Sequence, residues 1–185
     1  MDNIVYVNVT DKMYQAAAKR NQENIDLFNR MGVDNTFRKD KPQQKINGYL
    51  GEMAVQDFYK FLKFSDDIKY DFVYNNVTFD VKTQGGNHRP KPHHVATLYT
   101  YNMNKKCDYY IFTSCMNDGE TVYIAGFISQ KDFKEKAVLR EVGYVCSNFV
   151  YDQARYEIPY DQLNDPKTLA SVLKISNSNQ VNKNS

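Results

Sequence analysis

The sequence of 185 residues contains no tryptophan and only three cysteines. Cys107, Cys115 and Cys146 are widely spaced and include no C-x-x-C pair, which argues against a disulfide framework and against a cysteine zinc site. We expect them to be reduced thiols in the core. No hydrophobic run approaches the roughly 18 residues of a membrane span, and the first residues lack the features of a secretory leader. These absences predict a cytoplasmic protein with no membrane partner.

An excess of either charge is also absent, because 24 Lys and Arg residues face 22 Asp and Glu residues. The net charge of +2 therefore does not indicate or exclude a nucleic-acid partner. Length and composition favour one domain, over residues 1–175, with residues 176–185 as a disordered polar tail.

Periodicity predicts helices first and strands after them. The predicted helices cover residues 11–31, 43–64, 130–139 and 166–175, and the predicted strands cover residues 69–74, 77–82, 108–114, 121–128 and parts of 144–158. Ser129 and Asp132 resemble a helix cap at the start of the third helix. This order predicts an α/β or α+β fold in which helices pack on a sheet.

Alternating residues on both sides of Asn75 and Asn76 predict a β-hairpin. A two-residue turn there pairs Phe72 with Phe79 on a core face and Asp71 with Asp80 on the other face. Carboxylates about 5 Å apart repel by about 3 kcal/mol at an effective dielectric constant of 20. A divalent cation would turn that repulsion into attraction, and Mg²⁺ accepts oxygen ligands.

Two further residues belong to the same hypothesis. Lys82 follows Asp80 by two positions, so its ammonium group points to the same site and could orient a water or stabilise a phosphate. Glu52 lies on the predicted second helix beside Gly48 and Gly51, whose missing side chains would let that helix approach a sheet closely. The alternative is an exposed edge hairpin with ordinary salt bridges and a solvent-exposed Glu52.

The helix segment NGYLGEMAVQDF, followed by the hairpin YDFVYNNVTFDVKTQ, resembles the PD-(D/E)XK nuclease superfamily. That family's motif is a helix Glu, an Asp and then (Asp or Glu)-x-Lys on adjacent strands. Tyr70 stands at the nominal Pro position. The resemblance implies a restriction-endonuclease-like fold, with a central mixed β-sheet flanked by helices. It also implies Mg²⁺, with Mn²⁺ as a substitute, held by Asp71, Asp80 and the carbonyl of Val81 with support from Glu52, and a water assisted by Lys82.

Basic residues gather after this motif, because no Asp or Glu occurs between Asp80 and Asp108. We interpret this stretch as a loop that grips phosphates beside the active site. Gln84 could bond a phosphate or the attacking water. The candidate nucleic-acid contacts are Gln84, His88, Arg89, Lys91, Lys105, Lys106, Arg38 and Lys39. Ordinary solvated loops explain the basic runs about equally well, and we favour surface positions over zinc binding for the histidines.

The sequence therefore predicts a Mg²⁺-dependent DNA endonuclease, with a homodimer as a plausible form for double-strand cleavage. The alternatives are a structure-selective resolvase, an RNA-cutting enzyme of the same fold, or a nucleic-acid-binding protein without catalysis. The abundance of Asn, Lys and Tyr without Trp is typical of an AT-rich genome such as that of a bacteriophage. The site of action would then be the host cytoplasm.

Overall fold

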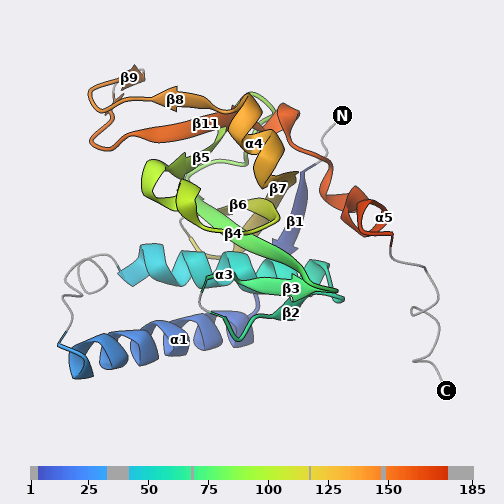
Figure 1. Ribbon diagram of the computed structural model, residues 1–185. Coiled ribbons are helices and arrows are strands. Elements are labelled where there is room, and N and C mark those ends of the chain that lie inside the picture. Colours follow the sequence, from blue (N-terminus) through green and yellow to red (C-terminus); the bar gives the residue numbers. More distant parts are fainter. Residues whose placement is uncertain (1–3, 33–41, 68, 117, 147–148, 175–185) are drawn as a thin grey trace.

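The structure is a computed structural model, and it describes residues 4–32, 42–67, 69–116, 118–146 and 149–174. A central sheet separates a layer of helices from a second, smaller sheet (Figure 1). No helix among the described residues is both long and apolar enough to cross a membrane.

The central sheet has six strands in the order β1-β7-β6-β4-β3-β2. Strands β4 and β6 run parallel, and every other neighbouring pair is antiparallel, so the sheet is mixed. The strands are β1 (Val5–Asn8), β2 (Lys63–Phe64), β3 (Phe72–Tyr74), β4 (Val77–Gly86), β6 (Tyr109–Met116) and β7 (Thr121–Ser129). The prediction that the chain starts with helices was wrong, since β1 precedes them and pairs with β7.

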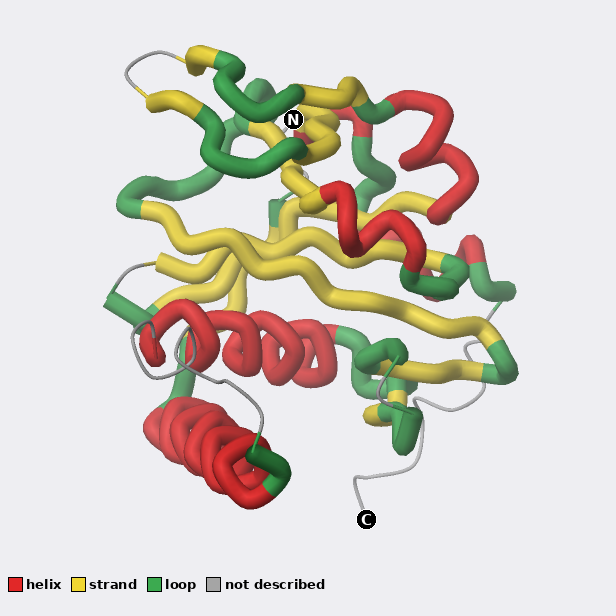
Figure 2. Tube along the Cα trace, turned by 60° about the vertical axis from the view of Figure 1, so that its left-hand side comes forward, coloured by secondary structure: helices red, strands yellow, loops and turns green. Residues whose placement is uncertain are grey.

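Two helices cover one face of this sheet, with α3 against the strands and α1 outside it (Figure 2). Helix α1 (Asp11–Arg30) begins at Thr10, whose Oγ1 accepts a hydrogen bond from Met13 N at 3.2 Å. Helix α3 spans Pro42–Phe58, so the predicted helix of residues 43–64 was too long. Leu62 continues the four-residue apolar repeat of the sequence, which extended the predicted helix. In the structure it is buried but lies after the helix, where a turn leads into β2.

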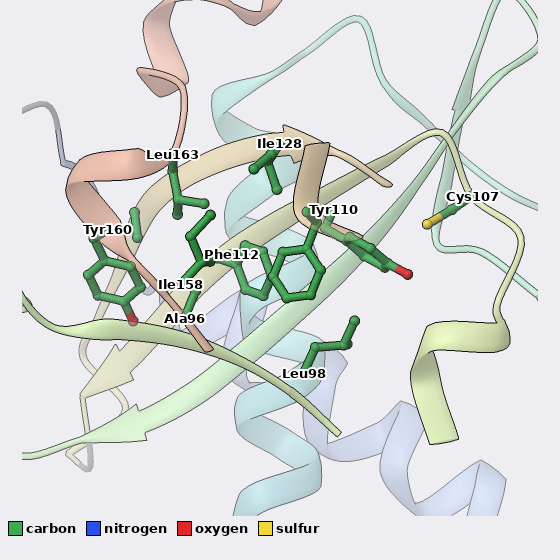
Figure 3. Close-up of a cluster of buried hydrophobic side chains, with 11 residues drawn as sticks. Ala96, Leu98, Cys107, Tyr110, Phe112, Ile128, Ile158, Tyr160 and Leu163 are labelled. Atoms are coloured by element: carbon green, nitrogen blue, oxygen red, sulfur yellow. The ribbon is translucent and has the colours of Figure 1, made fainter. Parts of the chain in front are cut away.

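The opposite face is covered by a three-stranded sheet in the order β5-β11-β8 and by α4. Its strands are β5 (Val95–Tyr99), β8 (Val138–Arg140) and β11 (Arg155–Pro159), and α4 spans Gln130–Lys136. Figure 3 shows the core between the layers, where Ala96 and Leu98 from β5 and Ile158 from β11 meet Phe112 from β6. The cap at Ser129 is confirmed, because its Oγ accepts from Asp132 N at 3.0 Å.

Several predicted boundaries in this region were wrong. Residues 95–99 form β5 rather than part of a loop, and the predicted helix of residues 130–139 ends at Lys136 because Val138–Arg140 pairs with β11. The remaining short elements are η1 (Thr100–Asn104), β9 (Val145–Cys146), β10 (Phe149–Val150), η2 (Tyr160–Gln162), η3 (Pro166–Thr168) and α5 (Leu169–Val172). The tail of residues 176–185 lies outside the described residues.

The predicted fold class is confirmed, because a mixed central sheet packs against helices in one α/β arrangement. The expected flanking helices α1 and α3 lie on one face, whereas the second sheet and α4 share the other (Figure 1). Cys107 and Cys115 are buried as expected, but Cys146 is exposed on β9.

Candidate active site

The predicted hairpin forms in the predicted register. Strands β3 and β4 pair Phe72 with Phe79, Val73 with Thr78 and Tyr74 with Val77. Asn75 and Asn76 have φ angles of 46° and 67°, the left-handed conformation that a tight hairpin turn requires. Because register fixes which face each side chain occupies, Phe79 and Val81 point to the core beneath α3. Asp80 therefore points to the opposite face, toward the second sheet.

Asp71 does not pair with Asp80 as a regular ladder partner, and that part of the prediction was wrong. The ladder ends at Phe72 and Phe79, and Asp71 N donates to the Phe79 carbonyl at 2.9 Å. The Asp71 carboxylate instead accepts a hydrogen bond from Val81 N, at 2.7 Å from Oδ2. A side chain thus replaces the main-chain partner of β4 at the point where β3 separates from it.

Asp80 is a buried carboxylate held by two lysines. Its side chain is 1% exposed, with Lys82 Nζ at 2.5 Å from Oδ2 and Lys105 Nζ at 3.0 Å from Oδ1. Lys82 comes from the same strand, as the i+2 spacing predicts, whereas Lys105 comes from the residues between η1 and β6. Oδ2 is buried and, despite this ion-pair contact, makes no hydrogen bond of normal geometry.

Glu52 reaches the same region from α3. Its helix lies close to the sheet at Gly51, where a Cβ atom would meet Thr83 Oγ1 at 2.0 Å and Thr113 Oγ1 at 2.7 Å. The expected role of a glycine in close packing is thus confirmed at Gly51, but it was wrong for Gly48, which has open space around its Cβ position. Glu52 Oε2 accepts a hydrogen bond from Arg20 Nη1 of α1 at 2.6 Å.

Electrostatics show that these carboxylates act on one another. Burial, followed by the charge of Asp71 and, more weakly, of Asp80, raises the pKa of Glu52 to about 7 although Arg20 opposes the shift. Burial and the charge of Asp80 likewise raise the pKa of Asp71, against the opposing effects of Val81 N–H and the two lysines. The charges of Asp71 and Asp80 therefore act on Glu52, which approaches the sheet from α3.

The other predicted contacts are spread over the surface. Gln84 lies on the same strand and face as Asp80, and its Oε1 accepts from the Tyr160 hydroxyl at 3.1 Å. His88, Arg89 and Lys91 are exposed beyond the end of β4. At about 3.3 Å per residue, the end of this strand lies about 20 Å from Asp80, so these residues do not border the carboxylates as predicted. Lys106 is exposed next to Lys105, and Arg38 and Lys39 lie outside the described residues.

The donor atoms suit a hard divalent cation, since they are carboxylate oxygens that repel one another. Within the part of the chain that the structure describes, however, no group of three or more His, Cys, Asp or Glu side chains is arranged to hold a metal. Lys82 and Lys105 pair with Asp80 and Arg20 pairs with Glu52, so a cation at Asp80 would compete with an ammonium group. Lys105 is the more exposed of the two lysines and is the one that we expect a cation to replace.

Three contacts in this region were not predicted from the sequence, or were predicted with another role. Arg20 was not singled out, because nothing local connects it with Glu52, 32 residues away. Lys105 was placed in a phosphate-binding loop, whereas it pairs with Asp80 inside the site. Tyr160 on Gln84 depends on a contact across 76 residues. The local signal that could have pointed to Lys105 is its place just before the strand parallel to β4.

Comparisons of the chain with protein-family models, with curated proteins and with solved structures found no match.

Proposed function

We propose that this protein is a Mg²⁺-dependent deoxyribonuclease of the PD-(D/E)XK type that hydrolyses DNA phosphodiester bonds. The observation that carries the proposal is the contact of Lys82 with the buried carboxylate of Asp80, beside which the Asp71 carboxylate accepts a hydrogen bond from Val81 N. The charges of Asp71 and Asp80 also raise the pKa of Glu52. The order of these residues along the chain and their placement on a helix, before a strand and on the paired strand agree with the motif.

Keeping Glu52 and Asp71 charged in this buried region is costly for a protein that only needs to fold. The raised pKa values mean that the charged forms are destabilised by burial and by a neighbouring carboxylate, which is Asp71 for Glu52 and Asp80 for Asp71. Arg20 pairs with Glu52, and Lys82 and Lys105 pair with Asp80, so the positive side chains equal the carboxylates in number. A divalent cation would offset the burial and repulsion that still raise the two pKa values, which favours the catalytic proposal over a structural role.

The position of each residue suggests its role in metal binding or in hydrolysis. Asp71, Asp80 and Glu52 are the groups that would hold Mg²⁺, with the carbonyl of Val81 as the further ligand that the family motif implies. When bound, the ion would supply charge stabilisation for the phosphate and would lower the pKa of a water. Lys82, which contacts Asp80, would orient that water or contact a phosphate oxygen. Lys105, once released from Asp80, provides a second positive charge for the phosphate backbone.

The exposed basic residues would contact the phosphates of this substrate. His88, Arg89 and Lys91 lie beyond the end of β4, which is about 20 Å from Asp80, or about six base pairs of B-form DNA. Such contacts to phosphates position a duplex without reading its sequence. We expect such an enzyme to act in the cytoplasm, on the DNA of the cell or of an infecting genome, and a homodimer would serve double-strand cleavage.

Cleavage of supercoiled plasmid tests the proposal. We expect nicking with Mg²⁺ or Mn²⁺ but not with EDTA, and a loss of at least 100-fold in Asp80→Asn and Lys82→Met, since one electrostatic contact to a transition state contributes about that much. Asp57→Asn is the matched control, because Asp57 lies on α3 near Glu52 but pairs with Lys60 on the surface.

Two results would contradict the proposal. Metal-independent cleavage, or equal activity in Asp80→Asn and the wild type, would separate the carboxylates from the chemistry. Binding of DNA without cleavage of plasmid, branched DNA or RNA would favour the alternative of a non-catalytic nucleic-acid-binding protein, for which the lysine-paired Asp80 is the supporting observation.

A further inference from the structure

A stack of aromatic and guanidinium groups includes Tyr101, four positions before Lys105 in the chain. Tyr99, at the end of β5, and Tyr101, in η1, have ring centroids 5.6 Å apart and planes within 6° of parallel. Arg155 on β11 is paired with Tyr99 in the ladder, and its Cζ lies 4.9 Å from the Tyr99 ring centroid. The same Cζ lies 4.0 Å from the ring centroid of Tyr151, so Arg155 joins two aromatic side chains.

This stack faces away from the core. Ala96 and Leu98 of β5 point into the core between the sheets, so Tyr99 points to the outer side by alternation. Tyr101 is 67% exposed, whereas the Arg155 side chain is 11% exposed. The tyrosine at the end of the stack is therefore open to a further planar ring, and the groups behind it are held by their neighbours.

Residues 101–105 connect the stack to the carboxylate site, and contacts of Lys105 hold the end of this segment. Lys105 follows Tyr101 by four positions, a rise of about 8 Å in a 3₁₀ conformation, or about two nucleotides of a DNA strand. Lys105 is fixed by its ion pair with Asp80, and its carbonyl accepts a hydrogen bond from Gln130 Nε2. Lys106 adds a second positive charge beside it.

The chemistry of the stack matches a nucleobase. Proteins bind single strands by stacking bases on aromatic side chains beside basic residues that contact the backbone, and arginine adds a cation–π contribution. Bases inside a duplex are stacked on one another and are not available to a protein ring. A base that reaches Tyr101 must therefore be unpaired.

We propose that Tyr101, supported by Tyr99 and Arg155, is a stacking site for an unpaired base next to the phosphate that the carboxylate site cleaves. This inference rests on the proposed function, and it adds a substrate class to it. The preferred substrate is DNA with a single-stranded segment at the cleavage point, such as a flap, a branch or a frayed end.

The test is the fluorescence anisotropy of a labelled oligothymidine and of a duplex of the same length, both in EDTA so that binding is measured without cleavage. We expect the wild type to bind the single strand more tightly than the duplex. Tyr101→Ala should weaken binding of the single strand about tenfold, within the range for loss of one base-stacking contact, and leave duplex binding unchanged. Tyr101→Phe, which keeps the ring, should bind as the wild type does.

Tyr6→Ala is the matched control, because Tyr6 is 62% exposed on β1 at the far edge of the central sheet. Equal binding of the single strand by Tyr101→Ala and the wild type would overturn the stacking site, as would a defect in Tyr101→Phe equal to that of Tyr101→Ala. Plasmid and flap cleavage with Mg²⁺ separates the two proposals. If the wild type binds the single strand through Tyr101 but cleaves neither substrate, the nuclease proposal is refuted and the stacking site is retained. If the enzyme cleaves DNA and Tyr101→Ala changes neither binding nor cleavage, the stacking site is refuted and the nuclease proposal is retained.

Discussion

Asp80 is a buried carboxylate whose charge other groups of the protein must offset. A carboxylate that is almost fully buried is tolerated only when cations or hydrogen bonds offset its lost hydration. Here Lys82 and Lys105 provide that charge, one to each oxygen. Both lysines therefore stabilise the metal-free form, and Lys105 occupies a position that a bound cation would need.

The first prediction concerns this competition. Lys105→Met should lower the free energy of unfolding in EDTA by about 1–3 kcal/mol, because a buried charge loses one of two partners. The same substitution should raise the affinity for Mn²⁺ several-fold, since no ammonium group has to be displaced from Asp80. Urea denaturation and calorimetric titration measure the two effects.

Lys106→Met is the control for that variant, because Lys106 is the exposed neighbour of Lys105. It should change neither quantity. A Lys105→Met protein with unchanged or weaker Mn²⁺ affinity would show that the ammonium group does not compete with the ion.

The raised pKa of Glu52 predicts how stability depends on pH. A carboxyl group with a pKa of about 7 when folded, against an ordinary value of 4.5, binds more protons in the folded state between these limits. The stability that it contributes is full below pH 4.5 and is lost as pH rises to 7. The shift corresponds to a loss on the order of 3 kcal/mol, to which the raised pKa of Asp71 adds in the same direction.

Urea denaturation in EDTA at pH 5 and pH 8 measures this dependence. Glu52→Gln should flatten the profile and should be the more stable protein at pH 8. The interpretation fails if the variant and the wild type lose equal stability over this range.

At the scale of elements, the distance between α3 and the sheet depends on Gly51. Gly51→Ala would place a Cβ atom 2.0 Å from Thr83 Oγ1, which forces the helix away from β4 or the threonines out of position. We expect a loss of about 1–3 kcal/mol in the free energy of unfolding and, because Glu52 moves with the helix, a reduced affinity for Mn²⁺.

Gly48→Ala is the matched control on the same helix, one turn away, with open space at the Cβ position. It should stabilise the protein by up to about 1 kcal/mol through helix propensity and leave metal affinity unchanged. Similar thermal unfolding of the two variants would contradict the close approach of α3 to the sheet at Gly51.

Local sequence patterns predicted those elements whose geometry is set by neighbours in the chain. The hairpin register follows from Asn75 and Asn76, and the cap at Ser129 follows from its own hydroxyl. The end of α3 did not follow from its pattern, because Leu62 is buried by tertiary packing after the helix has ended. Strand β5 was missed because its partner, β11, is more than 50 residues away.

At the scale of the whole molecule, the candidate site depends on contacts that no local pattern contains. The parallel pairing of β4 with β6 places Lys105, just before β6, beside Asp80 on β4. The packing of α1 on α3 places Arg20 on Glu52. The four motif residues could be selected from the sequence because order and alternation are local, whereas their protein partners depend on topology.

The same topology explains why the prediction of facing aspartates was only partly right. Alternation placed Asp71 and Asp80 on corresponding positions, but β3 leaves the sheet one residue too early for them to pair. Asp71 still acts electrostatically on Glu52, because its carboxylate accepts a hydrogen bond from Val81 N and its charge raises the pKa of Glu52.

A crystal structure of the wild-type protein soaked in Mn²⁺, with anomalous scattering data, tests most directly whether these carboxylates share a cation. We expect one anomalous peak between Asp71 and Asp80, within 2.0–2.6 Å of an oxygen of each, with Lys105 withdrawn from Asp80. An Asp80 that keeps both lysines, with manganese absent or bound elsewhere, would contradict the shared site and the nuclease proposal that depends on it.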